Sequence, residues 1–139
     1  MKQAFFVTCI ISMLSITAFA QKDEAGVKTC LEHYMSGEGN RVEQAFHPSA
    51  TMKFIDYQTG EFKDMPIADY IARVKTNSSS GAPRPSRKIE IISMNIEGTA
   101  AQAKIKIETD KNILYDYMNL LKVNGEWKIV SKIFNRQDK

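Results

Sequence analysis

The sequence contains little cysteine, and this scarcity excludes a disulfide-stabilised fold. Only Cys9 and Cys30 are present among 139 residues, and Cys9 lies in an N-terminal segment with the features of a cleavable leader. The thiol that remains has no internal partner, so neither an internal disulfide nor a cysteine-rich metal site is expected. Cys30 falls on the inward side of a predicted helix, where a free cysteine usually acts as a small buried hydrophobe rather than a reactive thiol.

An excess of one charge is also lacking. Lysine and arginine number 19 against 16 aspartates and glutamates, which gives a formal net charge of +3 that falls to +2 if Lys2 is removed. The basic residues are dispersed, and this excludes nucleic acid as an expected partner. The chain contains no glycine-rich phosphate loop, no serine nucleophile elbow and no His-Glu-x-x-His motif. His33 and His47 are far apart in sequence, so we expect no metal and no cofactor.

No hydrophobic run is long enough for a typical membrane span. The apolar segment from Ala4 to Phe19 is interrupted by threonines and serines, whereas a spanning helix needs roughly 20 apolar residues. Lys2 precedes this segment, and Ala18-Phe19-Ala20 has the small residues that signal peptidase recognises. Residues 1–20 are therefore predicted to be a signal peptide cut after Ala20. Residues 21–139 would form a single secreted or periplasmic domain with no membrane association after cleavage.

Asn124 and Gly125 mark a long β-hairpin at the C-terminus. Asn-Gly supplies the two positive-φ residues of a type I′ turn, so the flanking apolar-rich segments are predicted to be its strands. With Val123 opposite Glu126, strict alternation gives the hairpin two faces. The inward face is predicted to carry Asp116, Met118, Leu120, Trp127, Ile129 and Ile133, and the outward face Tyr115, Tyr117, Asn119, Lys128 and Lys132.

Three helices are expected before the main strands. Residues 24–37 carry apolar side chains at helical spacing, and they are Val27, Leu31, Tyr34 and Met35. Asn40 is predicted to cap a short second helix that ends at His47-Pro48. A small hairpin over residues 52–63 follows. Asp64 then precedes a third helix with Pro66 in its first turn and with Ile67, Tyr70, Ile71 and Val74 on its buried face.

Two further alternating segments complete an antiparallel meander of four strands. The first alternates at Ile92, Met94 and Ile96, and the second at Ala101, Ala103, Ile105 and Ile107. The serine- and proline-rich segment 77–86 is predicted to be a mobile loop. This order predicts an α+β fold in which three N-terminal helices pack on a curved antiparallel sheet to form a cone-shaped barrel. The small Ala101 and Ala103 would either allow the first helix to approach closely or leave a void.

Three segments carry a resemblance to a known family. They are Ala45-Phe46-His47-Pro48, Asp64-Met65-Pro66, and the closing run from Leu120 to Val130 that contains Asn124-Gly125-Glu126-Trp127. Together with the amphipathic first helix, they resemble the nuclear transport factor 2-like superfamily, and within it the group named putative lumazine-binding proteins, near the polyketide-cyclase-like group. The resemblance implies a cone with a pocket at its wide end, often paired into a homodimer through the outer sheet face.

Asp116 and Asp56 are the candidate catalytic residues. An isomerase or dehydratase of this architecture needs an acid or base inside an apolar cavity, because burial tunes a carboxyl group for proton transfer. Asp116 lies between Leu114 and Met118 on the inward face, and Asp56 shares its face with Met52 and Phe54. Either carboxylate could instead be solvated or paired with a lysine. No catalytic motif of the family transfers to this sequence, which argues against an enzyme.

The sequence leaves three hypotheses open. The first is an exported protein that binds a small apolar or aromatic molecule in a pocket lined by Tyr34, Tyr70, Met94, Ala103, Asp116, Met118 and Trp127. The second is a cofactor-free isomerase or dehydratase with Asp116 or Asp56 as its base. The third is a non-enzymatic interaction domain with a filled cone. An outer sheet face bearing Tyr115, Tyr117, Val130 and Phe134 would pair with a partner, and we expect a homodimer through it.

Overall fold

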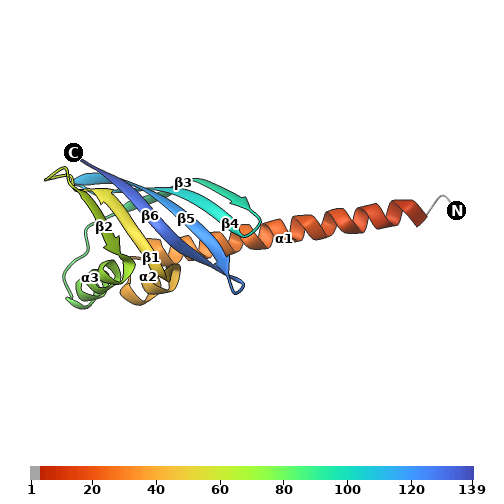
Figure 1. Ribbon diagram of the computed structural model, residues 1–139, viewed down its shortest axis with the longest axis horizontal. Helices are drawn as coiled ribbons and strands as arrows, with labels where there is room; N and C mark the ends of the chain where they lie inside the picture. Colours follow the sequence, from red (N-terminus) through yellow and green to blue (C-terminus); the bar gives the residue numbers. More distant parts are fainter. Residues whose placement is uncertain (1–3) are drawn as a thin grey trace.

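The computed structural model describes the backbone of residues 4–139 and the side chains of residues 18–139. The predicted signal peptide thus falls largely outside the described side chains. Three helices and six strands follow one another along the chain (Figure 1): α1 (Ala4–Met35), α2 (Gly39–Ala45), β1 (Phe46–Ile55), β2 (Phe62–Pro66), α3 (Ile67–Ser79), β3 (Lys88–Glu97), β4 (Ala100–Glu108), β5 (Asn112–Val123) and β6 (Glu126–Asp138).

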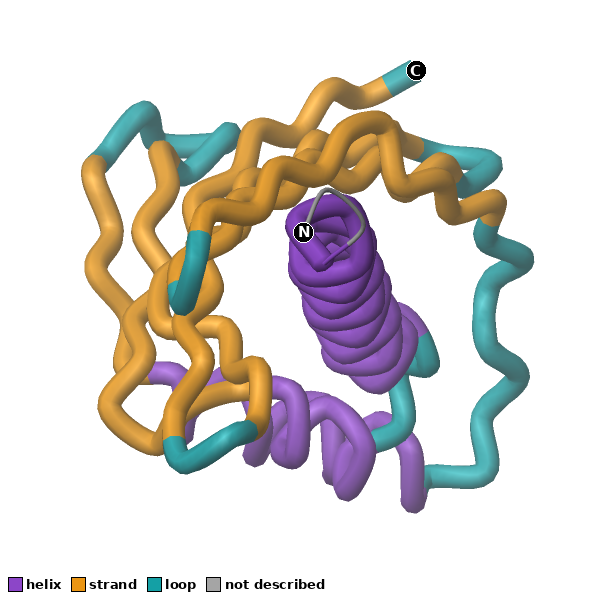
Figure 2. Tube along the Cα trace, turned by 90° about the vertical axis from the view of Figure 1, so that its right-hand side faces the viewer, coloured by secondary structure: helices purple, strands orange, loops and turns teal. Residues whose placement is uncertain are grey.

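The six strands form one curved sheet in the order β2-β1-β6-β5-β4-β3. Every neighbouring pair is antiparallel except β1 and β6, which run parallel. Figure 2 shows the sheet arching over α1 while α2 and α3 lie across the opposite side. The predicted α+β arrangement of three helices on a curved sheet is confirmed. The barrel is not closed, because β2 and β3 are free edges of the sheet.

The hairpin turn has the predicted geometry. Asn124 has a φ of 51° and Gly125 a φ of 85°, the pair of positive values that a type I′ turn requires. Val123 pairs with Glu126, and β5 and β6 then pair along their lengths. Asp116, Met118 and Leu120 are buried on the inward face, as predicted.

A β-bulge at Val130 corrects the predicted faces of β6. Asn119 pairs with Ser131 whereas Leu120 pairs with Ile129, so Val130 is an extra residue in the ladder. An extra residue reverses the alternation beyond it, because side chains in a strand point to opposite faces with a period of two. Lys132, predicted to face outward, is buried, and Ile133, predicted to face inward, is 54% exposed.

The same bulge changes the predicted dimer face. Phe134 pairs with Asp116 across the ladder and packs against the core, so it does not lie on the outer face. Ile133 takes that place opposite Tyr117, and both side chains are exposed. A second irregularity between Ile91 and Ser93 leaves Ile92 exposed rather than inward-facing.

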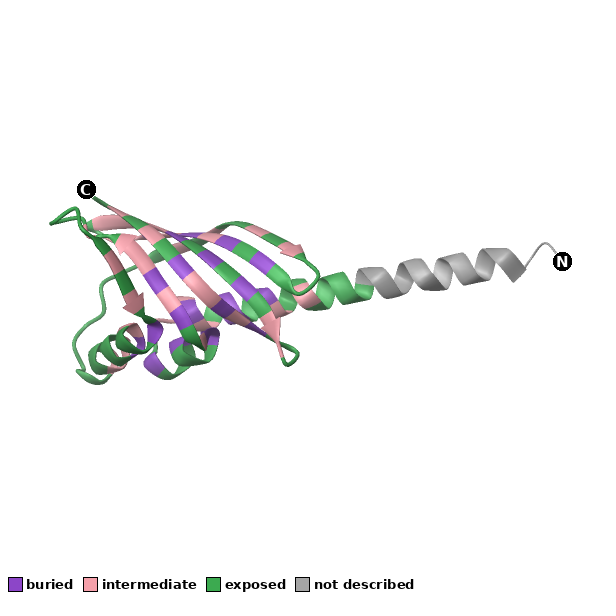
Figure 3. Cartoon of the chain, viewed as in Figure 1, coloured by how far each residue is buried: buried purple, intermediate pink, exposed green. Residues whose placement is uncertain are grey.

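The core lies between the concave face of the sheet and the helices. The strands show alternating buried and exposed positions (Figure 3), which is the pattern of a sheet with one covered face. Val27, Leu31 and Tyr34 of α1 are buried against it, as the helical spacing predicts. Ala101 and Ala103 are buried members of the same core.

The second and third helices differ from their predicted bounds. Glu38 occupies the capping position of α2, not Asn40, and α2 ends at Ala45 because β1 already begins at Phe46. The Asp64-Met65-Pro66 segment forms the end of β2 and leads directly into α3. Asp64 therefore precedes the helix as predicted, but Pro66 is its N-cap rather than part of its first turn. Asp64 pairs with Lys53 of β1 in the ladder and by an ion pair of 2.5 Å, and this pairing draws the segment into the sheet. Pro66 is tolerated there because β2 is an edge strand.

Candidate functional site

Three polar side chains meet inside the apolar core. The Tyr34 hydroxyl donates a hydrogen bond of 2.5 Å to Asp116 Oδ2. Lys132 Nζ donates to the Tyr34 oxygen at 2.6 Å and forms an ion pair of 3.1 Å with Asp116 Oδ2. α1, β5 and β6 each contribute one member. We call this group the triad, and it joins residues 98 positions apart in sequence at its extremes.

The fold positions each member of the triad. Tyr34 lies in the last turn of α1, on the stripe that packs onto the sheet. Asp116 and Met118 face inward on β5, and the Val130 bulge turns Lys132 to the same face, opposite Met118. The tyrosine is 4% exposed, the aspartate 0% and the lysine 4%. Charged groups are almost never this buried unless they are paired.

Burial keeps the hydroxyl group of Tyr34 protonated. Burial, and then the neighbouring Asp116 carboxylate, raises the pKa of the Tyr34 hydroxyl well above its usual range. Tyr34 therefore remains a proton donor at physiological pH. Asp116 Oδ1 has no hydrogen-bond partner among the described residues, which is unusual for a buried carboxylate oxygen.

Lys132 lies among aromatic rings at the wall of a cavity. Its Nζ is 4.8 Å from the centre of the Tyr34 ring, 5.0 Å from that of Phe134 and 5.6 Å from that of Tyr70, within the range of cation–π attraction. An ammonium group has three N–H donors, and the triad uses two. The third has no acceptor among the described residues, and Lys132 is part of the cavity lining.

This triad cavity has a volume of about 460 Å³, within the range of small-molecule sites. Phe54 and Phe134 stack in its wall with ring centres 4.7 Å apart. The other apolar lining residues are Met35, Met52, Ile55, Met65, Val74, Ile107 and Leu114, and the aromatic hydroxyls are those of Tyr34, Tyr57 and Tyr70. Asp116 does not line the cavity; Tyr34 and Lys132 do, so they are the triad members that a bound molecule would touch.

Asp56 lines the same cavity but is engaged in a turn. Its Oδ1 accepts hydrogen bonds from the N–H groups of Gln58 and Thr59 at 2.9 and 3.1 Å. Those two amides, Thr59 first, hold the pKa of the Asp56 carboxyl below its usual value. A carboxylate stabilised in this way is a weak base, and its local hydrogen bonds explain its position at the end of β1.

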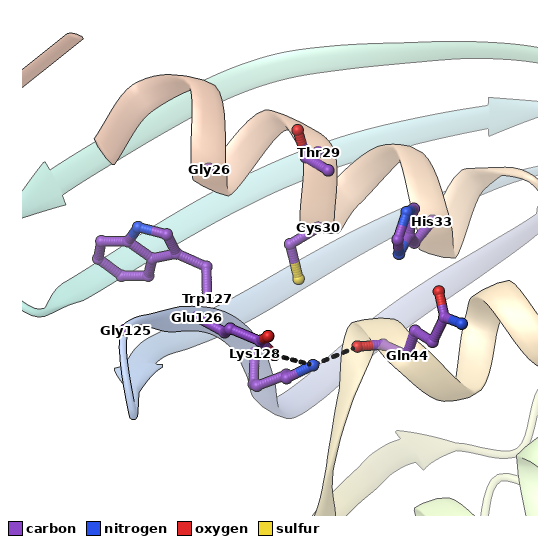
Figure 4. A pocket seen from close by; sticks show the side chains of 9 residues that line it. All are labelled: Gly26, Thr29, Cys30, His33, Gln44, Gly125, Glu126, Trp127 and Lys128. Carbon is purple, nitrogen blue, oxygen red and sulfur yellow. Dashed lines mark hydrogen bonds and ion pairs between the residues drawn. The ribbon is translucent and has the colours of Figure 1, made fainter. Parts of the chain in front are cut away.

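A second hollow, the hairpin hollow, lies next to the β5–β6 turn and also has a volume of about 460 Å³. Figure 4 shows its lining, with Trp127 and Lys128 of β6 facing Gly26 and Cys30 of α1. Lys128 Nζ donates to the Gln44 carbonyl oxygen at 2.9 Å. The two hollows have no lining residue in common.

The predicted pocket residues are thus divided among three environments. Tyr34 and Tyr70 line the triad cavity, and Asp116 lies behind its wall. Trp127 lines the hairpin hollow instead. Met94, Ala103 and Met118 line neither hollow, because their side chains pack into the core. The sequence reasoning missed Lys132, for which alternation from the turn gave the wrong face.

Trp127 is held at the hairpin end by contacts with α1. Its Nε1 donates to Asp23 Oδ1 at 3.3 Å, and a Cβ added at Gly26 would lie 2.7 Å from Trp127 Cδ1. The indole therefore packs directly on the helix backbone at Gly26, where any larger residue would collide with it. The lone tryptophan fills the space between helix and hairpin.

Cys30 and the histidines have structural surroundings. Cys30 is buried, and burial raises the pKa of its thiol to about 11, which suits the predicted inert hydrophobe. His47 Nδ1 accepts a hydrogen bond from the Ser49 N–H at 3.2 Å, a local structural contact. His33 lines the hairpin hollow.

Neither a metal centre nor a membrane span stands out in the described part of the chain. Within residues 18–139, no three side chains of the His, Cys, Asp and Glu types gather closely enough to hold a metal ion. None of the helices in this part combines the length and the hydropathy needed to cross a bilayer.

Comparison with known proteins gives one family and several structural relatives. The family model described as Putative lumazine-binding matches residues 22–135. The aldolase FrzH of a Cladobotryum species is 24% identical over 105 residues, which covers 76% of this chain and 81% of that protein.

Two solved structures from bacteria are similar over nearly the whole domain. An NTF2-like protein of unknown function from Shewanella baltica is 27% identical with a TM-score of 0.73, covering 85% of this chain and 96% of that chain. An NTF2-like protein of unknown function from Methylobacillus flagellatus is 29% identical with a TM-score of 0.71, covering 84% and 93%.

Proposed function

Because this chain belongs to the Putative lumazine-binding family, within the nuclear transport factor 2-like superfamily, we propose that it binds a small molecule in the triad cavity. The observation that carries the proposal is a cavity of about 460 Å³ with an apolar aromatic wall and one buried cation, Lys132. Binding sites typically combine such a wall with a few fixed polar groups. The ligand would place its apolar body against Phe54 and Phe134 and a polar oxygen against the free N–H of Lys132.

A neutral fluorescent probe tests this proposal. N-phenyl-1-naphthylamine has an apolar aromatic body and brightens when it leaves water, so we expect a saturable rise in its emission with the protein. Val74→Trp should fill part of the triad cavity and weaken binding about tenfold or more, whereas Thr29→Trp, which enters the hairpin hollow, should leave it unchanged. No saturable binding, or equal binding by both variants, would overturn the proposal.

The probe emission is a better readout than the intrinsic tryptophan. Trp127 lines the hairpin hollow and contacts Gly26 and Asp23 rather than the triad cavity. Its emission therefore reports the packing of α1 on the hairpin in the parent protein. Because Val74→Trp and Thr29→Trp each add a second indole, circular dichroism is the check that these variants remain folded.

We also propose that the protein is exported after cleavage behind Ala20. Ala18 to Lys22 are exposed, and among the described side chains of α1, which begin at Ala18, Asp23 is the first that is partly covered. Among residues 18–139, the buried core begins at Val27, which lies after this point. N-terminal sequencing of the protein from the culture medium or periplasm should begin at Gln21. A chain that retains Met1 in the cytoplasmic fraction would contradict this proposal.

A second candidate function is cofactor-free carbonyl chemistry of the aldol type. It is supported by the Lys132 amine and the Tyr34 hydroxyl at the cavity wall, with Asp116 behind them to take up or return a proton. The 24% identical relative is named an aldolase. An aromatic β-hydroxy ketone whose cleavage releases a fluorescent aldehyde would test it. Release that exceeds the buffer rate and disappears in Lys132→Met, under conditions where circular dichroism shows that the variant is folded, would support this function. A rate equal to buffer for the parent protein would exclude it for this substrate class.

We further propose that two copies pair through the convex face of the sheet. Tyr117, Leu121 and Ile133 are exposed large hydrophobic residues on this face, and such patches commonly mark interfaces. Light scattering should give twice the monomer mass for the protein and the monomer mass for Tyr117→Lys. A monomer in both samples would refute the dimer.

A further inference from the structure

The charges around the triad cavity point to the class of molecule that enters it. Four cationic side chains line the cavity, namely Arg73, Arg87, Lys132 and Arg136, against one carboxylate, Asp56. The carboxylate already accepts two backbone hydrogen bonds in its own turn. The lining therefore offers an excess of positive charge beside an apolar interior.

Two of these cations are balanced within the protein. Lys132 is paired with Asp116 behind the cavity wall. Arg136 Nε is 2.8 Å from Asp138 Oδ1, and its guanidinium lies 3.9 Å from the centre of the Tyr57 ring. Neither residue leaves much uncompensated charge toward the cavity.

Arg73 and Arg87 are not balanced in this way. Neither forms an ion pair with any carboxylate among residues 18–139. Arg87 is held in position, since a Cβ added at Gly37 would lie 2.5 Å from its Nη2 and its guanidinium donates to the Ser36 carbonyl oxygen at 3.4 Å. A guanidinium has five N–H donors, so most of those on Arg87 remain open.

We infer that the ligand is an amphipathic anion, an apolar or aromatic body that carries a carboxylate, sulfonate or phosphate group. The inference rests on the proposed binding function and adds the chemistry of the ligand to it. The anionic group is received by Arg73 of α3 and Arg87 just before β3, while the apolar body lies along the stacked rings of Phe54 and Phe134. Planar guanidinium groups suit carboxylates, phosphates and related oxyanions better than an ammonium group does.

A matched pair of probes tests this inference. 8-Anilinonaphthalene-1-sulfonate and N-phenyl-1-naphthylamine share an arylamine body, and only the first carries a charge. We expect the sulfonate to bind about tenfold more tightly at low ionic strength, with the preference shrinking in high salt because ionic attraction between accessible groups is screened. The Arg73→Gln/Arg87→Gln double variant should lose the preference and keep its affinity for the neutral probe.

Arg41→Gln is the matched control, because Arg41 is an exposed arginine of α2 outside the cavity lining. It should retain the preference for the sulfonate, and Val74→Trp should weaken both probes. Equal affinities for the two probes would overturn the inference and leave the binding function intact. Failure of both probes to bind would remove the binding function itself. If the double variant still preferred the sulfonate probe, the inference would also be overturned, since other residues would then bind the sulfonate group.

Discussion

Replacement of Lys132 by methionine is expected to be among the most costly single changes to this fold. The side chain is 4% exposed and lies 3.1 Å from the Asp116 carboxylate, which is itself fully buried. Methionine preserves much of the volume but leaves Asp116 with the Tyr34 hydroxyl alone. Breaking a buried pair by removal of one partner typically lowers the free energy of unfolding by about 3–5 kcal/mol. We expect a loss in that range, measured by urea denaturation with linear extrapolation.

The double variant separates the charge effect from the loss of packing. Asp116→Asn removes the carboxylate, so Lys132→Met/Asp116→Asn no longer contains an unpaired buried charge. We expect a coupling free energy of about 2 kcal/mol between the two positions, within the range seen for residues in one network. Lys128→Met is the control, because Lys128 forms an ion pair with the largely exposed Glu126 and a hydrogen bond to the Gln44 carbonyl oxygen, and exposed ion pairs contribute about 0–1 kcal/mol. A Lys132→Met variant within about 1 kcal/mol of the parent, with no coupling to Asp116, would refute the role assigned to this pair.

Three further predictions concern other parts of the chain. Gly26→Val should lower the free energy of unfolding by about 1–3 kcal/mol and shift the Trp127 emission to the red, because the added atoms would collide with the indole; unchanged stability and emission would contradict this packing. Hydrogen bonds and charge from two lysines hold the pKa of Glu108 at about 2 in the folded protein. Glu108 therefore contributes stability that is present above its unfolded pKa of about 4.5 and is lost as pH falls through its folded pKa. Glu108→Gln should flatten the acid limb of a stability–pH curve, and an identical curve would argue against these ion pairs. Cys30, with a thiol pKa of about 11, should react with a disulfide reagent in a Cys9→Ser chain only on denaturation, and rapid native labelling would show that the thiol is accessible.

Much of the architecture could be predicted from local signals in the sequence. Asn124-Gly125 identified both the hairpin and its register, because few other dipeptides adopt two successive positive φ values. Helical spacing identified the buried stripe of α1, and alternation identified Asp116 as inward-facing. These features follow from neighbours along the chain, where periodicity is informative.

The predictions that were wrong concern features that depend on contacts between distant segments. Asp64-Met65-Pro66 does precede α3, yet its pairing with the partner strand β1 makes it a strand up to the residue before the helix. The extra residue at Val130 has no marker in the local sequence, since a valine fits either a regular strand or a bulge. Counting residues outward from the turn therefore placed Lys132 on the wrong face of the sheet. For this reason the sequence analysis did not identify the cation of the triad.

The bulge determines how homologous sequences must be aligned over β6. Deletion of Val130 would leave Ser131 opposite Asn119 and Lys132 opposite Met118, so the ladder would become regular while the ammonium group stayed inward. A chain of unchanged length that paired regularly from the turn would instead place Ile133 inward and turn Lys132 toward solvent, because side chains alternate between the two faces. A homologue that is one residue shorter here should therefore be aligned with its gap at Val130, so that inward positions are compared with inward positions.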